Sequence, residues 1–448
     1  MNDSRNTPDP PKHMETTMAL LEKVFKLSDN GTTVRTEIIA GITTFLTMAY
    51  IIAVNPGILA NAGMDFGAVF VATCIAAALG TAVMGFAANY PVALAPGMGL
   101  NAFFTFGVVL GMGQSWQIAL GCVFWSGIIF LLLSVFRIRE WIINAIPMSL
   151  KTGIAVGIGL FLAIIGLQGA GVIVDHQATL VTLGDVTTPQ VLLFFLGFFI
   201  ITALYYRRIP GAVIIGILAT TAAGFFFGLI EYRGIVSLPP SIGPTLLQLD
   251  IFGALEAGLY AVIFAFLFVD LFDTSGTLIA VAKEGDLLDE KDRLPRLGRA
   301  LMADSSASVT GSLLGTSTTT SYIESSAGIA SGGRTGLTAV TVAVCFILAL
   351  FFSPLAMMIP SYATASALLF VSVLMISSIS SINWQDLTES APVVVTAVMM
   401  PLTYSIADGI AIGFISYALI KLLAGKSGDI NISVSIITLL ALCKYIIL

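Results

Sequence analysis

The chain has 448 residues, of which 57% are hydrophobic and only 10% are charged, and its formal net charge at pH 7 is −6. Because soluble globular proteins are about one quarter charged, this composition excludes a soluble enzyme. The modest net charge argues for no nucleic-acid partner. The apolar stretches suit helices of about 20 residues that cross a bilayer, whereas the weak alternating segments of membrane barrels are absent. The sequence therefore predicts an all-α polytopic membrane protein.

Residues 1–35 form a polar N-terminal tail without the apolar region of a cleavable signal peptide. About fourteen apolar segments follow, expected at 36–55, 66–86, 93–111, 117–136, 148–168, 189–206, 211–231, 254–282, 300–314, 322–332, 336–354, 363–382, 391–405 and 407–424. The segment at 322–332 is too short to cross alone. Residues 425–448 form a C-terminal tail whose last apolar stretch has no assigned place; an interfacial position is one option.

Lysine and arginine residues predict how the chain is oriented in the membrane. With a cytoplasmic N-terminus and about fourteen crossings, nearly all of the 20 basic residues fall on the cytoplasmic side. Arg233 falls outside, and Lys444 lies in the ambiguous tail. We therefore expect a multi-pass protein of the cytoplasmic (inner) membrane with its N-terminus in the cytoplasm.

The loop around VSLPPSIGPTLLQLD divides the chain into two halves, 36–245 and 246–424. Since each half contains an odd number of segments, a duplicated second half must be inverted, which is a recurring transporter plan. The third segment of each half is interrupted by small or polar residues, at PVALAPGMGLNAFF (91–104) and LLGTSTTTSYIESSAG (313–328). Unwound backbone at the midplane is tolerated only against protein or a cavity. The alternative is a simple kink or a re-entrant surface loop.

Carboxylates inside apolar segments are costly and point to function. The run FAFLFVDLFDTSGTLIAVA places Asp270 and Asp273 in the eighth segment, near one helix face. Glu324 follows a Ser/Thr run in the tenth, and Asp304 opens the ninth. The alternatives are that the two aspartates only shape a polar vestibule, that Glu324 lies on an exposed loop, and that Asp304 is a plain helix-end carboxylate.

Aromatic and polar residues near the interruptions are further candidates for a ligand site. Asn101 follows the PGMG break, and Phe103, Phe104 and Tyr322 are placed to stack on a planar ligand or simply to pack in the core. Thr44, in the first segment, occupies the repeat position that matches Asp273, although a bond to its own helix is the alternative.

Histidine and cysteine offer little chemistry in this chain. His13 lies in the N-terminal tail and His176 in an outside loop, so any proton coupling must use a carboxylate. The four cysteines have no metal-like spacing. A membrane-embedded enzyme would need a nucleophile–base pair or metal ligands, and with no histidine in a helix we expect no enzyme, no metal and no cofactor.

Several motifs resemble the AzgA-type purine permeases, which belong to the nucleobase–cation symporter-2 superfamily together with the xanthine and uracil permeases. These motifs are NYPVALAPGMGLNAFF, FDTSGTL, GTSTTTSYIES, GGRTGLTAV and NWQDLTESAP, and the resemblance runs from about residue 20 to 445. It implies fourteen segments in two inverted seven-helix repeats with core and gate domains. It also implies a base held between segments 3, 8 and 10, and an elevator-type homodimer.

The resemblance also implies roles for individual residues. The acidic position of the eighth helix falls on Asp273, that of the tenth segment on Glu324, its next polar position on Ser325, and the ninth-helix carboxylate on Asp304. Uracil and xanthine permeases usually place Glu in the eighth helix, but aspartate matches the AzgA branch. The expected substrate-binding set is Glu324, Asp273, Asn101, Phe103, Phe104, Thr44, Ser325 and Thr277, and the expected proton-coupling set is Glu324, Asp273 and Asp304.

We therefore expect proton-coupled import of purine bases, with adenine favoured, guanine or hypoxanthine possible as substrates, and sodium a less favoured coupling ion. One alternative is an anion exchanger on the same fold, which should offer its substrate a cation or a helix N-terminus. Only Arg334 lies near the two interruptions. The other alternative is a uracil or xanthine permease.

Overall fold

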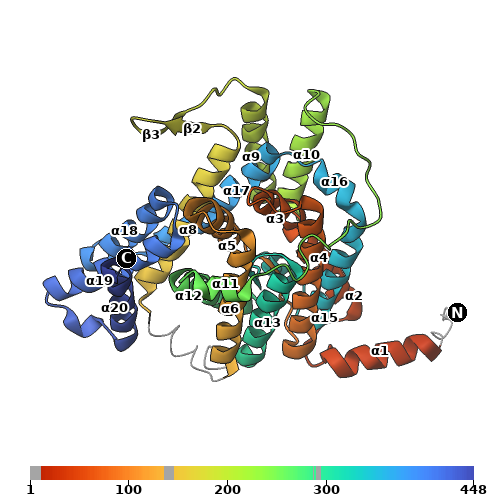
Figure 1. Cartoon of the computed structure of the whole chain (residues 1–448). Coiled ribbons are helices and arrows are strands. Elements are labelled where there is room, and N and C mark those ends of the chain that lie inside the picture. Colours follow the sequence, from red (N-terminus) through yellow and green to blue (C-terminus); the bar gives the residue numbers. More distant parts are fainter. Residues whose placement is uncertain (1–11, 136–145, 286, 289–293, 448) are drawn as a thin grey trace.

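The computed structural model describes residues 12–135, 146–285, 287–288 and 294–447. The chain is predominantly helical, which agrees with the sequence prediction (Figure 1). The expectation of an all-α protein needs one correction, because two pairs of short strands are present. One pair lies at the two interruptions, and the other, β2 (Ile173–His176) with β3 (Leu180–Leu183), forms a hairpin between two long helices.

The helices of the first half begin with one at the polar tail and continue through the expected apolar segments. They are α1 (Lys12–Phe25), α2 (Val34–Met48), α3 (Ile51–Ala60), α4 (Phe66–Val83), α5 (Met98–Ala102), α6 (Trp116–Val135), α8 (Met148–Gly169), α9 (Pro189–Tyr206) and α10 (Ala212–Phe226). Two π-helical stretches, Met84–Ala88 and Phe103–Gly111, extend α4 and α5. The first predicted segment is therefore two helices, with a break between α2 and α3.

The second half is also helical. Its helices are α11 (Ile251–Glu256), α12 (Tyr260–Glu284), α13 (Leu297–Leu314), α14 (Ser325–Ala330), α15 (Gly336–Ala349), α16 (Ser353–Met357), α17 (Ser361–Ile376), α18 (Leu387–Thr403), α19 (Ile406–Leu423) and α20 (Ile432–Ile447). In Figure 1, α18, α19 and α20 gather on one side of the molecule, and α2, α4 and α15 lie on the other.

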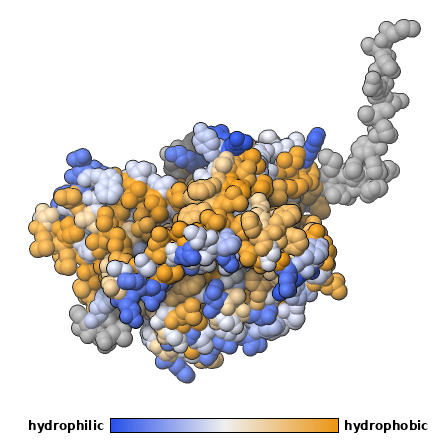
Figure 2. Space-filling view, turned by 90° about the horizontal axis from the view of Figure 1, so that it is seen from above, coloured by the Kyte–Doolittle hydropathy of each residue, from blue (hydrophilic) through white to orange (hydrophobic). Residues whose placement is uncertain are grey.

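Within the described part of the chain, 9 helical runs are long and apolar enough to cross a membrane. Three shorter apolar helical runs are Met98–Gly111, Ala212–Phe226 and Leu387–Thr403. Many large apolar side chains are exposed, and Figure 2 shows them as extensive orange areas of the surface. Since water-soluble monomers rarely expose large contiguous apolar patches, this surface suits lipid. The helix α13 is not among these runs, because it is rich in serine and carries Arg299 and Asp304.

The two interrupted segments meet at the centre of the molecule. Strand β1 (Leu94–Pro96) pairs antiparallel with β4 (Thr319–Ser321), and both strands are fully buried. The Gly97 amide also donates to the Thr318 carbonyl at 2.9 Å. Each unwound stretch thereby satisfies the backbone groups of the other, as a non-helical segment inside a membrane requires. This burial excludes the alternative of a re-entrant surface loop.

A glycine is required where the first interruption ends. A Cβ atom on Gly97 would lie 2.8 Å from the Cγ2 atom of Thr320, which is closer than real Cβ contacts. The absence of a side chain at Gly97 therefore lets the chain after β1 approach β4 closely.

The C-terminal tail, whose place the sequence left open, is helix α20 and packs against α19. The Thr438 hydroxyl donates to the Phe414 carbonyl at 3.3 Å, and the Tyr445 hydroxyl donates to Asp408 Oδ1 at 2.7 Å. The tail is therefore held against the helix bundle along its length.

A buried carboxylate joins α2 to the start of α15. Glu37 is fully buried and accepts hydrogen bonds from the backbone amides of Arg334 (2.8 Å), Thr335 (3.2 Å) and Thr338 (3.1 Å). The Thr338 hydroxyl donates to the same carboxylate at 2.6 Å. These amides belong to the first turn of α15 and the loop before it, so Glu37 caps this helix from a distant part of the chain.

Glu37→Ala is expected to lower the thermal stability of the purified protein by several degrees. The substitution leaves the backbone amides of Arg334 and Thr335 without an acceptor, and each such group costs about 1–3 kcal/mol when buried. Thermal unfolding in detergent, followed by tryptophan fluorescence, would measure the change. Glu231→Ala, in an exposed loop, is the control. Equal unfolding temperatures for the two variants would contradict the capping role.

Candidate functional site

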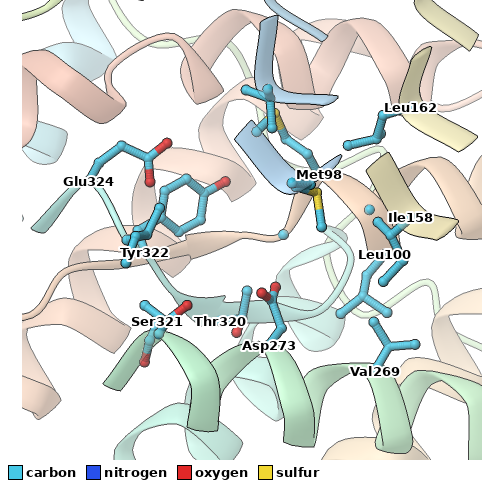
Figure 3. Close-up of a pocket in the computed structure, with 16 residues that line it drawn as sticks. Met98, Leu100, Ile158, Leu162, Val269, Asp273, Thr320, Ser321, Tyr322 and Glu324 are labelled. Carbon is cyan, nitrogen blue, oxygen red and sulfur yellow. The ribbon is translucent and has the colours of Figure 1, made fainter. Parts of the chain in front are cut away.

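A cavity of about 110 Å³ lies beside the paired strands (Figure 3). A single water molecule needs only about 10–15 Å³ by this measure, so the space is large enough for a small ligand. Five parts of the chain form its walls: the start of α5, α8, α12, the stretch from β4 to α14, and α17. The lining residues are Gly97, Met98, Gly99, Leu100, Ile158, Leu162, Val269, Asp273, Thr277, Thr320, Ser321, Tyr322, Ile323, Glu324, Val371 and Met375.

Two carboxylates face this cavity from different walls. Asp273 comes from the middle of α12, and Glu324 immediately precedes α14. Figure 3 shows both side chains directed inward, with the ring of Tyr322 between them in this view. The remaining walls are largely aliphatic, and among the described residues that line the cavity there is no Lys or Arg. The site therefore combines hydrogen-bond acceptors with apolar surface.

Glu324 is held by a tyrosine that the sequence analysis did not single out. The Tyr50 hydroxyl, at the break between α2 and α3, donates to Glu324 Oε1 at 2.5 Å. The Thr47 hydroxyl also lies 3.3 Å from the Glu324 carbonyl oxygen. The signal for Tyr50 was present in the sequence, as a polar hydroxyl within the apolar run TMAYIIAVNP. Its partner lies 274 positions away in the chain, so the pairing was not visible there.

Tyr322 forms part of the cavity wall. Its hydroxyl donates to the Pro96 carbonyl at 2.5 Å, and its own amide donates to the Ala93 carbonyl at 2.9 Å. Tyr322 is therefore bonded to the segment 93–96, which contains β1, through both its backbone amide and its hydroxyl. A fixed aromatic ring next to a cavity is suited to contact a planar ligand.

Asp304 lies behind the strand β4. The Ser321 hydroxyl donates to its Oδ1 at 3.0 Å, and the Thr274 hydroxyl donates to its Oδ2 at 2.8 Å. The Thr320 hydroxyl lies 2.7 Å from that of Thr274. Because Ser321 and Thr320 line the cavity, Asp304 is connected to it by two routes, one through the Ser321 hydroxyl and one through the hydroxyls of Thr274 and Thr320.

The structure also locates Asp270, to which the sequence analysis assigned no role beyond its place in the eighth segment. It is fully buried, and the Ser308 hydroxyl lies 3.1 Å from its Oδ2 and 2.9 Å from the Thr319 carbonyl oxygen. Asp270 thus lies between α12, α13 and β4, and it does not line the cavity.

The third segment's aromatic residues lie in the core behind the cavity rather than in its wall. Phe103 and Phe104 are fully buried, and the ring of Phe103 packs 5.1 Å from that of Phe266. Asn101 is fully buried as well, and its side-chain amide has no hydrogen-bond partner among the described residues.

Two further predicted residues support the short helix α14. The Ser325 hydroxyl accepts a hydrogen bond from the Ala93 amide at 3.0 Å, so it joins α14 to β1. Thr44 faces Gly328, where an added Cβ atom would lie 2.0 Å from the Thr44 hydroxyl oxygen. Of the predicted substrate-binding set, the structure thus brings Asp273, Thr277 and Glu324 to the cavity and places the other members behind it.

Comparison with known proteins identifies the family. The profile of the xanthine/uracil permeases, described as the Permease family, matches residues 35–412. Adenine permease AdeP of Escherichia coli (strain K12) is 54% identical over 438 residues, which are 97% of this chain and 98% of that protein. Guanine/hypoxanthine permease PbuG of Bacillus subtilis (strain 168) is 48% identical over 426 residues, which are 92% of this chain and 96% of that protein.

The fold agrees with this assignment. The transmembrane domain of BicA, a cyanobacterium bicarbonate transporter, superposes with a TM-score of 0.66 and covers 82% of this chain and 96% of its own. Its sequence identity is only 16%, so the likeness concerns the fold alone. The chain belongs to the xanthine/uracil permease family, groups there with the AzgA-type purine permeases, and is a membrane transporter rather than an enzyme.

Proposed function

We propose that this protein imports purine nucleobases, with adenine preferred, by proton symport. The observation that carries the proposal is the pair of carboxylates, Asp273 and Glu324, that face one cavity next to a fixed aromatic ring. The purine permeases that resemble the chain over nearly its whole length support the substrate class, and the higher identity to an adenine permease supports the preference.

The chemistry of a neutral purine suits these walls. Ring N–H groups and an exocyclic amine donate hydrogen bonds that carboxylate oxygens accept, while the flat faces contact an aromatic ring. A buried group left without its partner costs about 1–3 kcal/mol, which provides a basis for selecting one base over another. In this proposal Asp273, Glu324 and Thr277 contact the base. The residues behind them, Asn101, Phe103, Phe104, Thr44 and Ser325, complete the binding site.

Proton coupling is assigned to the same carboxylates. Asp273 and Glu324 are the acidic side chains among the described residues that line the cavity. Asp304 is connected to it through the Ser321 hydroxyl, and through Thr274 and Thr320, so it serves as the third member of the proton-coupling set. Carboxylates inside membrane segments commonly serve as proton relays, which supports the proton as the coupling ion in this proposal.

We propose fourteen segments in two inverted repeats, 36–245 and 246–424, with core and gate domains. The 9 long apolar runs and the three shorter ones reach this number once the polar helix α13 and the short helix α14 are included. The antiparallel pairing of β1 with β4 supports inversion, since each follows the second span of its half. A cytoplasmic N-terminus, an inner-membrane location and a homodimer complete this proposal.

The other functions considered fit the cavity less well. An anion exchanger should offer its substrate a cation or a helix N-terminus. The starts of α5 and α14 reach the cavity, but Asp273 and Glu324 also face it, and the described lining residues include no Lys or Arg. A uracil or xanthine permease remains a distinct outcome of the experiment below. Uptake of labelled adenine into proteoliposomes should be inhibited by excess adenine, less by guanine or hypoxanthine, and least by xanthine or uracil. Strong inhibition by uracil or xanthine alone would overturn the proposed substrate class.

A protonophore is expected to abolish the accumulation of labelled adenine in proteoliposomes that have an imposed pH gradient. The reason is that uphill movement of the base requires a simultaneous downhill movement of protons. Accumulation is measured with and without the protonophore, in sodium and in potassium buffers. Accumulation that survives the protonophore and requires sodium would contradict proton symport.

A further inference from the structure

Tyr50 occupies an unusual position relative to the cavity. It lies at the break between α2 and α3, is fully buried, and does not line the cavity. Its hydroxyl nevertheless makes the only side-chain hydrogen bond to the Glu324 carboxylate within the described part of the chain, at 2.5 Å. Any influence of Tyr50 on a ligand must therefore act through Glu324.

The two oxygens of the Glu324 carboxylate are not equivalent. Oε1 accepts the Tyr50 hydroxyl, whereas no side chain among the described residues donates to Oε2. Glu324 is only partly buried and forms part of the cavity wall, so its uncommitted oxygen is the one available to a ligand. Figure 3 shows the carboxylate at the edge of this space, next to Tyr322.

A glutamate side chain has three rotatable bonds, and ordering it when a ligand binds reduces affinity. A short hydrogen bond from a fully buried tyrosine orders the carboxylate in advance. Ala49 and Tyr50 keep helical φ and ψ angles where α2 gives way to α3, so the tyrosine is carried by a nearly continuous helical run, Val34–Ala60.

We propose that Tyr50 is a positioning residue for the substrate: it holds Oε1 of Glu324 so that Oε2 alone is presented to the base. This inference rests on the proposed function, since it assumes that Glu324 contacts a purine. The proposal has a second part, which is that the base and the proton bind at the same oxygen. Oε1 is occupied by the Tyr50 hydroxyl, so Oε2 is the oxygen that carries the proton when the carboxyl group is neutral.

Tyr50→Phe removes the hydroxyl and retains the ring. For adenine uptake into proteoliposomes, we expect KM to rise about ten- to a hundredfold, the range for loss of a hydrogen bond to a charged group, while the maximal rate changes little. Tyr90→Phe is the matched control. Tyr90 is also buried, and its hydroxyl accepts one hydrogen bond, from the Arg296 amide at 3.0 Å, but it does not line the cavity or contact Glu324.

Infrared difference spectroscopy of adenine binding tests the mechanism directly. Carboxylate bands that are absent in Glu324→Gln belong to this residue, and Tyr50→Phe should shift them while Tyr90→Phe leaves them in place. This readout separates positioning from a general loss of structure, because a purely structural change would not move these bands selectively.

The outcomes distinguish this inference from the proposed function. If the wild-type protein transports no purine, the proposed function fails. If the wild type transports adenine and Tyr50→Phe keeps both the wild-type KM and the wild-type carboxylate bands, the positioning role is wrong. If Tyr50→Phe lowers only the amount of folded protein, and the folded fraction has a normal KM, the role of Tyr50 is structural and the inference is also overturned.

Discussion

Glu324→Gln is expected to reduce adenine accumulation to the background of empty proteoliposomes. Glutamine keeps the size of the side chain, and its carbonyl oxygen can still accept the Tyr50 hydroxyl. The amide NH₂ group of the glutamine then faces the cavity. It is a hydrogen-bond donor, so it cannot accept a hydrogen bond from an N–H group of the base. The variant also loses the carboxyl group that we assign to proton binding. Losing a hydrogen bond and leaving a donor unpaired, at about 1–3 kcal/mol each, predicts a fall in rate of at least about thirtyfold.

This expectation is measured as initial uptake and as steady-state accumulation, with the amount of reconstituted protein determined in parallel. Glu256→Gln is the control, because Glu256 is exposed at the end of α11, away from the cavity. Normal uptake by Glu324→Gln would show that the carboxylate held by Tyr50 is not part of the binding site.

Asp273→Asn is also expected to abolish accumulation, although for a partly different reason. Asparagine is nearly the same shape and retains an oxygen that can accept a hydrogen bond from the base. It cannot bind and release a proton, so uphill transport should be lost. Exchange of internal for external adenine, which needs no net proton movement, should be retained at a measurable rate.

Counterflow in proteoliposomes preloaded with unlabelled adenine would separate these two activities. Asp175→Asn, on the exposed strand β2, provides a carboxylate control outside the cavity. If Asp273→Asn still accumulated adenine against its gradient in response to pH, Asp273 would not be a proton carrier. If it lost both accumulation and exchange, its role would lie in binding the base.

Much of the fold could be predicted from the sequence, because hydropathy is a local property. The long apolar segments coincide with helices, and the interruptions at 91–104 and 313–328 contain the strands β1 and β4. Local composition could not show that these two strands pair with each other. That contact joins residues more than 200 positions apart, and it depends on how the two halves pack.

The candidate site was predictable to a similar extent. Asp273 and Glu324 stand out in the sequence because a carboxylate in an apolar segment is costly, and both face the cavity. The aromatic residues gave a weaker signal, since stacking on a ligand and packing in the core require the same side chains. Tertiary packing places Phe103 in the core and Tyr322 in the wall. Tyr50 was missed because its importance comes entirely from a distant partner.

The sequence by itself determined that this protein is a helical membrane transporter of the purine permease type. Hydropathy, carboxylates within apolar segments and short sequence motifs are all local properties of the chain. Only the tertiary structure decided which side chains face the cavity, that the two interruptions satisfy each other's backbone, and that Tyr50 binds one oxygen of Glu324. These features depend on contacts between segments far apart in the chain. Their geometry follows from the packing of many helices together, which no single stretch of sequence specifies.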